Sequence, residues 1–132
     1  MASATRRTVR VFANGCWDLL HAGHFNAFRQ ARELAARFDD DREQGQGGGH
    51  HHDPSASPPR VELVVGIHSN DTVAREKGKA LVMTDAERAE LLGACAMVDA
   101  VVPDVPYAHI TPELLDTVGP SRDQWRRNRA TL

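Results

Sequence analysis

Two histidines, separated by two residues, are of a type and at a spacing that could support catalysis or ligand binding. His21 and His24 enclose Gly23, and they follow an Asn14-Gly15 pair that could end a strand. If a helix begins near Gly23, its unpaired amides and the positive end of its dipole face an incoming anion, which glycine lets approach closely. Imidazoles also donate hydrogen bonds to oxygens that gain charge in a transition state. The pattern therefore predicts a polyphosphate site.

A metal site and a purely structural role are the alternatives for this pair. No third ligand lies at a sensible position, and the sequence has neither a His-Glu-x-x-His motif nor the Gly-Lys-Ser/Thr ending of a P-loop. An isolated His-x-x-His pair is more often structural than functional. Its position between a predicted strand and a predicted helix favours a functional role here.

Strands and helices that would position the histidines alternate along the chain. The predicted elements span residues 8–13 (strand), 23–37 (helix), 61–67 (strand), 84–97 (helix), 100–102 (strand) and 112–118 (helix). Thr84 and Glu87 form a capping box, and Thr111 precedes a proline at the first helical position. Residues 68–79 are polar and predict a loop with a short helical turn. This order implies a parallel sheet that binds ligands at the carboxyl ends of its strands.

Composition limits the classes of protein to which the chain can belong. Its 132 residues allow one domain, and its net charge of −2 gives no reason to expect nucleic acid as a partner. Two distant cysteines argue against a disulfide scaffold or a zinc finger. No apolar run approaches the roughly 20 residues that span a bilayer. We therefore expect a soluble, cytoplasmic protein without a transmembrane segment.

Three parts of the chain are predicted to lie outside the folded domain. Residues 1–8 form a flexible N-terminus, and residues 119–132 form a polar, basic tail. Residues 39–59 are rich in Asp, Gly, His and Pro, and they lack the apolar side chains needed to offset the entropy of ordering. We expect a disordered insertion there, since nothing fixes a metal-binding geometry for its three consecutive histidines.

Around the histidine pair, the sequence resembles the first signature of the cytidylyltransferase family. Residues 15–32 read GCWDLLHAGHFNAFRQAR, which is most similar to the ethanolamine-phosphate branch of that family. Further matches are Val65-Gly66-Ile67-His68, Lys77-Gly78, Glu87-Arg88, Val98-Asp99 and Pro106-Tyr107. The resemblance covers residues 9–117 apart from the insertion. It implies an α/β fold with a Rossmann-like parallel sheet and flanking helices.

The resemblance also implies a role for each matching residue. His21, His24 and Lys77 would be catalytic, by binding the CTP phosphates and stabilising their charge. The residues implied in nucleotide binding are Asn14, Gly15, Cys16, Trp17, Asp18, Gly23 and Arg88. Tyr107 and Lys79 would lie near the substrate, and Lys79 is a second candidate for the role of Lys77. For Asp18 the resemblance implies that it steadies its loop. For Arg88 and Asp99, support of the architecture is favoured over a direct role in catalysis.

The implied reaction joins CTP to phosphoethanolamine and releases pyrophosphate and CDP-ethanolamine, a step of phosphatidylethanolamine biosynthesis. Mg²⁺ would enter through the CTP phosphates and not through a protein metal site. The resemblance also allows a homodimer. Choline-phosphate or glycerol-3-phosphate specificity remains an alternative. A truncated fragment without catalysis is another, because the family's later His-Gly-Asp and Arg-Thr-x-Gly-Ile-Ser-Thr motifs are not found.

Overall fold

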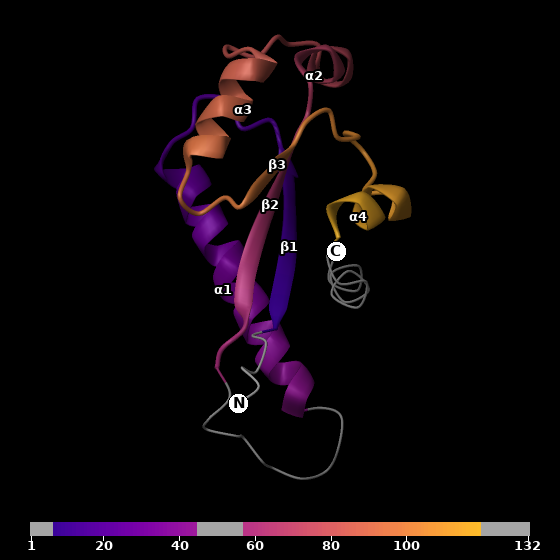
Figure 1. The fold of residues 1–132 in the computed structure, drawn as a ribbon. Coiled ribbons are helices and arrows are strands. Elements are labelled where there is room, and N and C mark those ends of the chain that lie inside the picture. Colours follow the sequence, from indigo (N-terminus) through magenta and orange to yellow (C-terminus); the bar gives the residue numbers. More distant parts are fainter. Residues whose placement is uncertain (1–6, 45–56, 120–132) are drawn as a thin grey trace.

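Three parallel strands and four helices make up the computed structural model, which describes residues 7–44 and 57–119. In chain order the elements are β1 (Thr8–Gly15), α1 (Ala22–Gln44), β2 (Arg60–Ile67), α2 (Asn70–Lys77), α3 (Asp85–Ala94), β3 (Ala100–Val102) and α4 (Pro112–Val118). The strands form one sheet in the order β1-β2-β3 (Figure 1). The predicted α/β class with a parallel sheet is confirmed.

The register of the sheet brings the carboxyl ends of β1 and β2 to the same level. Every residue of β1 pairs with one of β2, from Thr8 opposite Arg60 to Gly15 opposite Ile67. Beyond the last pair, the amide of His68 donates to the carbonyl of Gly15 at 3.0 Å. The two loops that leave these strands therefore start side by side, at the edge where parallel sheets bind ligands.

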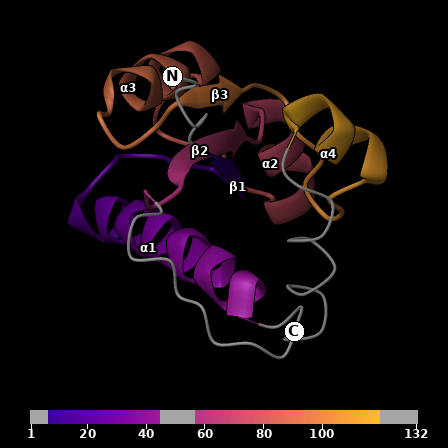
Figure 2. The same ribbon diagram turned by 60° about the horizontal axis from the view of Figure 1, so that its bottom comes forward.

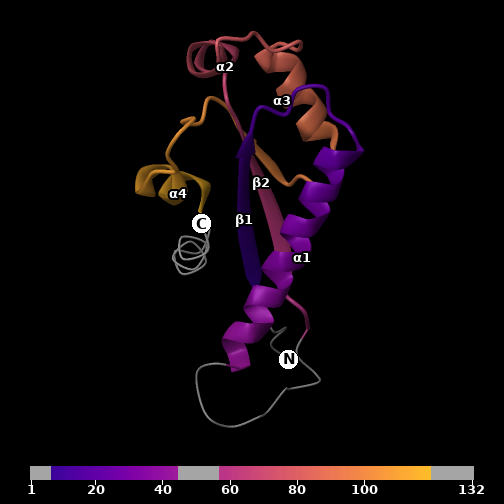
Figure 3. The same cartoon turned by 180° about the vertical axis from the view of Figure 1, so that it is seen from behind.

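One face of the sheet carries the main core. Phe28 of α1 and Leu92 of α3 pack on the β2 side chains of Leu63, Val65 and Ile67, and all five are buried. The views from three directions place α1 and α4 on opposite sides of the sheet (Figures 1, 2 and 3). Continuous burial along the second half of β2 agrees with the apolar run in its sequence, as expected for a parallel strand covered on both faces.

Two predicted boundaries near the histidines are wrong. Asn14 and Gly15 are paired within β1 and do not form a turn, so the chain leaves the sheet only at Cys16. The helix that follows continues to Gln44 instead of ending near Arg37. The first residues of the segment predicted to be disordered are therefore helical, while residues 45–56, with the three consecutive histidines, lie outside the described part.

The structure confirms some of the other predicted helices and strands and changes the bounds of the rest. The third strand and the last helix have the predicted bounds, and the capping box at Thr84 is present. The helix after that box ends at Ala94, three residues early. Residues 70–77 form a full helix instead of a short turn, capped by Ser69 and by the left-handed Gly78. Thr8 belongs to a strand, and residues 1–6 and 120–132 lie outside the described ranges.

Across residues 7–44 and 57–119, none of the helices combines the length and the apolar character that a bilayer crossing needs.

Candidate active site

The two histidines of the motif lie against one another at the start of α1. Their ring centroids are 4.0 Å apart, with His21 exposed and His24 half-buried. The Gly23 amide donates to Nδ1 of His21 at 3.0 Å, and the His21 amide donates to Nδ1 of His24 at 3.3 Å. A nitrogen that accepts a hydrogen bond carries no proton, so this geometry assigns the proton of each neutral imidazole to Nε2. Each ring therefore has an N–H donor left over for a ligand.

Gly23 is required by the position of the His21 ring. A Cβ atom at residue 23 would lie 2.8 Å from Cε1 and 3.0 Å from Nδ1 of that ring. The absent side chain thus gives His21 the space to fold back onto the first turn of α1. This is a more specific reason for the glycine than the approach of a phosphate to the backbone.

Two features of its surroundings act against protonation of His24. Partial burial lowers the pKa of His24 below its usual value, and the neighbouring charge of His21 lowers that pKa further. Desolvation disfavours the imidazolium, and two close imidazoles disfavour double protonation. Both effects favour the neutral imidazole at His24.

Upstream of the pair, the loop has a strained backbone. Trp17 and Leu19 adopt positive φ angles of 55° and 48°, which bulky side chains rarely do. The Trp17 indole donates to the carbonyl of Gly66 at 2.9 Å. Contacts with the rest of the protein, rather than local preference, therefore set the course of this loop.

Asp18 ties the loop to the segment before α3. Its two carboxylate oxygens accept hydrogen bonds from the amides of Val82 and Met83, at 2.8 and 2.9 Å. Burial acts to raise the pKa of Asp18, but these two amides and the charge of Arg88 outweigh it, and the pKa is lowered. Both oxygens therefore hold the loop to residues 82 and 83.

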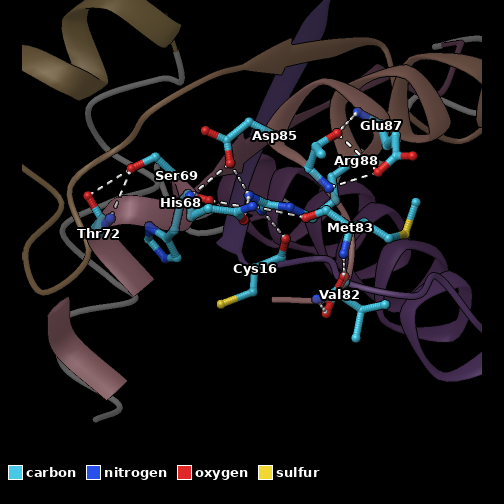
Figure 4. A network of polar contacts seen from close by, with 12 residues as sticks. Cys16, His68, Ser69, Thr72, Val82, Met83, Asp85, Glu87 and Arg88 are labelled. Carbon is cyan, nitrogen blue, oxygen red and sulfur yellow. Dashed lines mark hydrogen bonds and ion pairs between the residues drawn. The ribbon is translucent and has the colours of Figure 1, made fainter. Parts of the chain in front are cut away.

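A single buried arginine joins the ends of the two longer strands (Figure 4). Arg88 is fully buried, and its Nη1 donates to the carbonyls of Cys16 at 2.6 Å and of His68 at 2.8 Å. Its Nη2 donates to the side chains of Asn70 at 2.7 Å and of Asp85 at 2.6 Å. The guanidinium thus fixes the exit points of β1 and β2 relative to α3. Both terminal nitrogens of Arg88 are thus used within the protein.

A second cluster lies at the carboxyl end of β2. The ring of His68, which is buried, lies 4.9 Å from that of Tyr107, and its Nδ1 is 3.1 Å from the carbonyl oxygen of Val105. Nζ of Lys77 lies 5.8 Å from the centroid of the same Tyr107 ring. Lys79 is exposed on the chain that follows. The structure thus brings together Lys77, which the sequence assigned to the CTP phosphates, and Tyr107, which it assigned to the substrate.

His68 is the residue of this cluster that sequence reasoning did not select. Its signal was available, because it is a polar residue directly after a continuous buried strand. The remaining predicted residues, Asn14, Gly15 and Cys16, lie in β1 or just after it. In the part of the chain that the structure describes, no three His, Cys, Asp or Glu side chains gather as metal ligands would.

Sequence comparisons link this site to a group of known enzymes. Ethanolamine-phosphate cytidylyltransferase of Dictyostelium discoideum is 34% identical over 116 residues, which are 88% of this chain and 25% of that protein. Choline-phosphate cytidylyltransferase 2 of Arabidopsis thaliana is 36% identical over 87% of the chain and 30% of its own length. The chain is similar to the cytidylyltransferases over most of its length. It spans about a quarter of the length of these curated relatives.

Further comparisons bear on the fold. No protein-family model matches the chain. The crystal structure of the lipopolysaccharide core biosynthesis protein from Thermoplasma volcanium aligns with a TM-score of 0.56 and 22% identity, over 85% of this chain and 69% of that one. That similarity supports the Rossmann-like fold alone.

Proposed function

We propose that the protein containing this chain transfers a cytidylyl group from CTP to phosphoethanolamine. The observation that carries the proposal is the histidine pair, which presents two Nε2–H donors beside a helix N-terminus at the carboxyl edge of the sheet. Similarity to cytidylyltransferases over most of the chain supports it. A cytoplasmic location and a homodimer belong to the same proposal and rest on the sequence alone.

The proposed reaction is an in-line displacement at phosphorus. A phosphate oxygen of phosphoethanolamine attacks the α-phosphorus of CTP, the bond to the bridging oxygen of the β-phosphate breaks, and pyrophosphate leaves with CDP-ethanolamine as product. His21 and His24 would donate to the oxygens that gain charge, and Lys77 would neutralise part of it. No covalent intermediate forms, so Cys16 has no nucleophilic task. Positioning and charge stabilisation suffice for such a step.

Mg²⁺ belongs to the proposal as a companion of the nucleotide. Within the described ranges no cluster of three or more potential metal ligands exists, and Mg²⁺ often binds through substrate phosphates and water. When bound to CTP, the ion would offset phosphate charge. The protein's part is then to receive the nucleotide and its ion together, with Lys77 and the histidines as donors.

Choline-phosphate is the second candidate for the acceptor. A choline-phosphate relative is as similar to this chain as the ethanolamine-phosphate relatives are. Both acceptors offer the same phosphate nucleophile and differ in the methylation of the nitrogen. Offering both acceptors to a limiting amount of enzyme and measuring the product of each separates the two proposals. Exclusive use of phosphocholine would overturn the ethanolamine assignment.

A pyrophosphate-release assay with CTP, Mg²⁺ and phosphoethanolamine tests the function. We expect His24→Ala to lower turnover by about 100- to 1,000-fold, because it removes one donor to the charged transition state. His109→Ala is the matched control, since His109 is exposed and far along the chain. Equal turnover of both variants would contradict the proposal. Turnover by the 132 residues alone would rule out the alternative that this chain is a fragment without catalytic activity.

A further inference from the structure

Trp17 contacts three different parts of the candidate site. We propose that Trp17 is a positioning residue, whose indole fixes the orientation of the His24 imidazole before any ligand binds. The contact itself is independent of the proposed function, but its consequence for catalysis rests on that function. The resemblance to cytidylyltransferases implied a nucleotide contact for Trp17, and the geometry gives it a different task.

The indole lies between the core and the catalytic pair. Its ring centroid is 5.5 Å from that of His24, at an interplanar angle of 71°, and 4.9 Å from that of Phe28. Phe28 is fully buried among the residues that join α1 to the sheet. An edge-to-face contact of this kind holds ring orientation as well as distance. Through Trp17, His24 is thereby in contact with the buried core.

Three further features fix the indole itself. Its N–H donates to the carbonyl of Gly66, 49 residues away on β2. A Cβ atom at residue 15 would lie 2.9 Å from Cε2 of the indole, so Gly15 leaves room for the ring. The left-handed backbone of Trp17, with φ of 55°, is unfavourable for a bulky residue. A strained position that several contacts enforce is a common arrangement at functional sites.

Without the indole, His24 would depend on its neighbour His21, whose ring centroid lies 4.0 Å from its own. Its described polar contact is the long hydrogen bond of 3.3 Å from the His21 amide to Nδ1. His21 is also the titratable group whose charge acts on His24. Loss of the indole would admit water to the imidazole and free its rotation, while His21 would stay in place.

Histidine NMR titrations of the ligand-free chain test this role. In Trp17→Leu we expect the pKa of His24 to rise toward its usual value, because burial is the main cause that lowers it. Trp17→Phe keeps a ring but loses the N–H donor, so its pKa shift should be smaller. His109, which is exposed and 85 residues after His24 in the sequence, is the internal control. An unchanged His24 pKa in a folded Trp17→Leu chain would overturn the proposal.

Tryptophan fluorescence gives a second, independent readout. The chain has two tryptophans, so Trp125→Phe leaves Trp17 as the single emitter. A protonated imidazole quenches an adjacent indole, and emission should fall as the pH drops through the His24 pKa. His24→Asn should abolish that fall, and its persistence would refute the contact. Neither experiment uses CTP, so a chain that turns over CTP but fails both tests loses only the positioning role.

Discussion

The two halves of the candidate site are held in different ways. The loop after β1 is fixed by the carboxylate of Asp18, by the guanidinium of Arg88 and by the indole of Trp17, each through short hydrogen bonds to backbone groups. The half that contains Lys77 and Tyr107 has the ring contact between His68 and Tyr107, one polar contact of 3.1 Å from His68 to the carbonyl of Val105, and the exposed cation of Lys77 over Tyr107.

This difference matches what each half would have to do. Donors to a transition state act best when they are oriented in advance, since no reorganisation is then needed at the moment of reaction. A lysine that contacts an incoming phosphate needs a side chain that can move toward it instead of one that is held rigidly. Substitution of Asp18, Arg88 or Trp17, the anchors of the loop, should therefore lower the stability of the protein. Substitution in the half that contains Lys77 should change stability little.

The largest effect is expected from removal of the buried guanidinium. Arg88→Met should lower the free energy of unfolding by about 3 kcal/mol or more, because the carbonyls of Cys16 and His68 lose their buried donor. Urea unfolding followed by circular dichroism measures this. Arg29→Met is the control, because Arg29 forms exposed contacts with Glu33 and Asn26 on α1, and its loss should change stability by no more than about 0.5 kcal/mol. Similar losses in the two variants would remove the contrast between anchored and exposed residues.

A smaller effect is expected at the carboxylate that ties the loop to residues 82 and 83. Asp18→Asn should cost about 1–2 kcal/mol at neutral pH, since one amide loses a charged acceptor. The pKa of Asp18 is lowered in the folded state, so its contribution is present above the pKa of the unfolded chain. It is lost as the pH falls through the folded pKa.

The pH dependence provides the check on that assignment. Unfolding curves of the wild type and of Asp18→Asn should converge as the medium is acidified. A difference that stays constant with pH would show that the charge of Asp18 contributes nothing to the anchor.

The smallest effect on stability is expected in the half that contains Lys77 and Tyr107. Lys77→Met should change the free energy of unfolding by less than about 1 kcal/mol, because the cation lies at an exposed position over Tyr107. Thermal unfolding measures it directly. A loss as large as that of the Arg88 variant would mean that Lys77 is structural, and the contrast between the halves would fail.

The sequence predicted those parts of the fold that local chemistry determines. The cap at Thr84, the proline at the start of α4 and the apolar run of β2 each act within a few residues. The helix of residues 70–77 was missed because Val73 is its one buried residue, too little for an apolar stripe. The end of α1 was missed for the same reason, since its last residues are polar.

The candidate site was predictable in its residues but not in its supports. His21, His24 and Gly23 carry a local pattern, and the structure does bring the two imidazoles together. The hydrogen bond from Arg88 to Cys16 joins residues 72 positions apart. No spacing rule reveals such a contact, because it depends on how α3 packs against the sheet.

That long-range contact has a consequence for how the protein is made. The ribosome makes the histidine pair before the helix that carries Arg88, but the loop that precedes the pair has an unfavourable backbone that only later residues can hold in place. Until the helix with Arg88 has emerged and packed, the two imidazoles sit on an unanchored chain. Assembly of the site thus coincides with completion of this part of the fold.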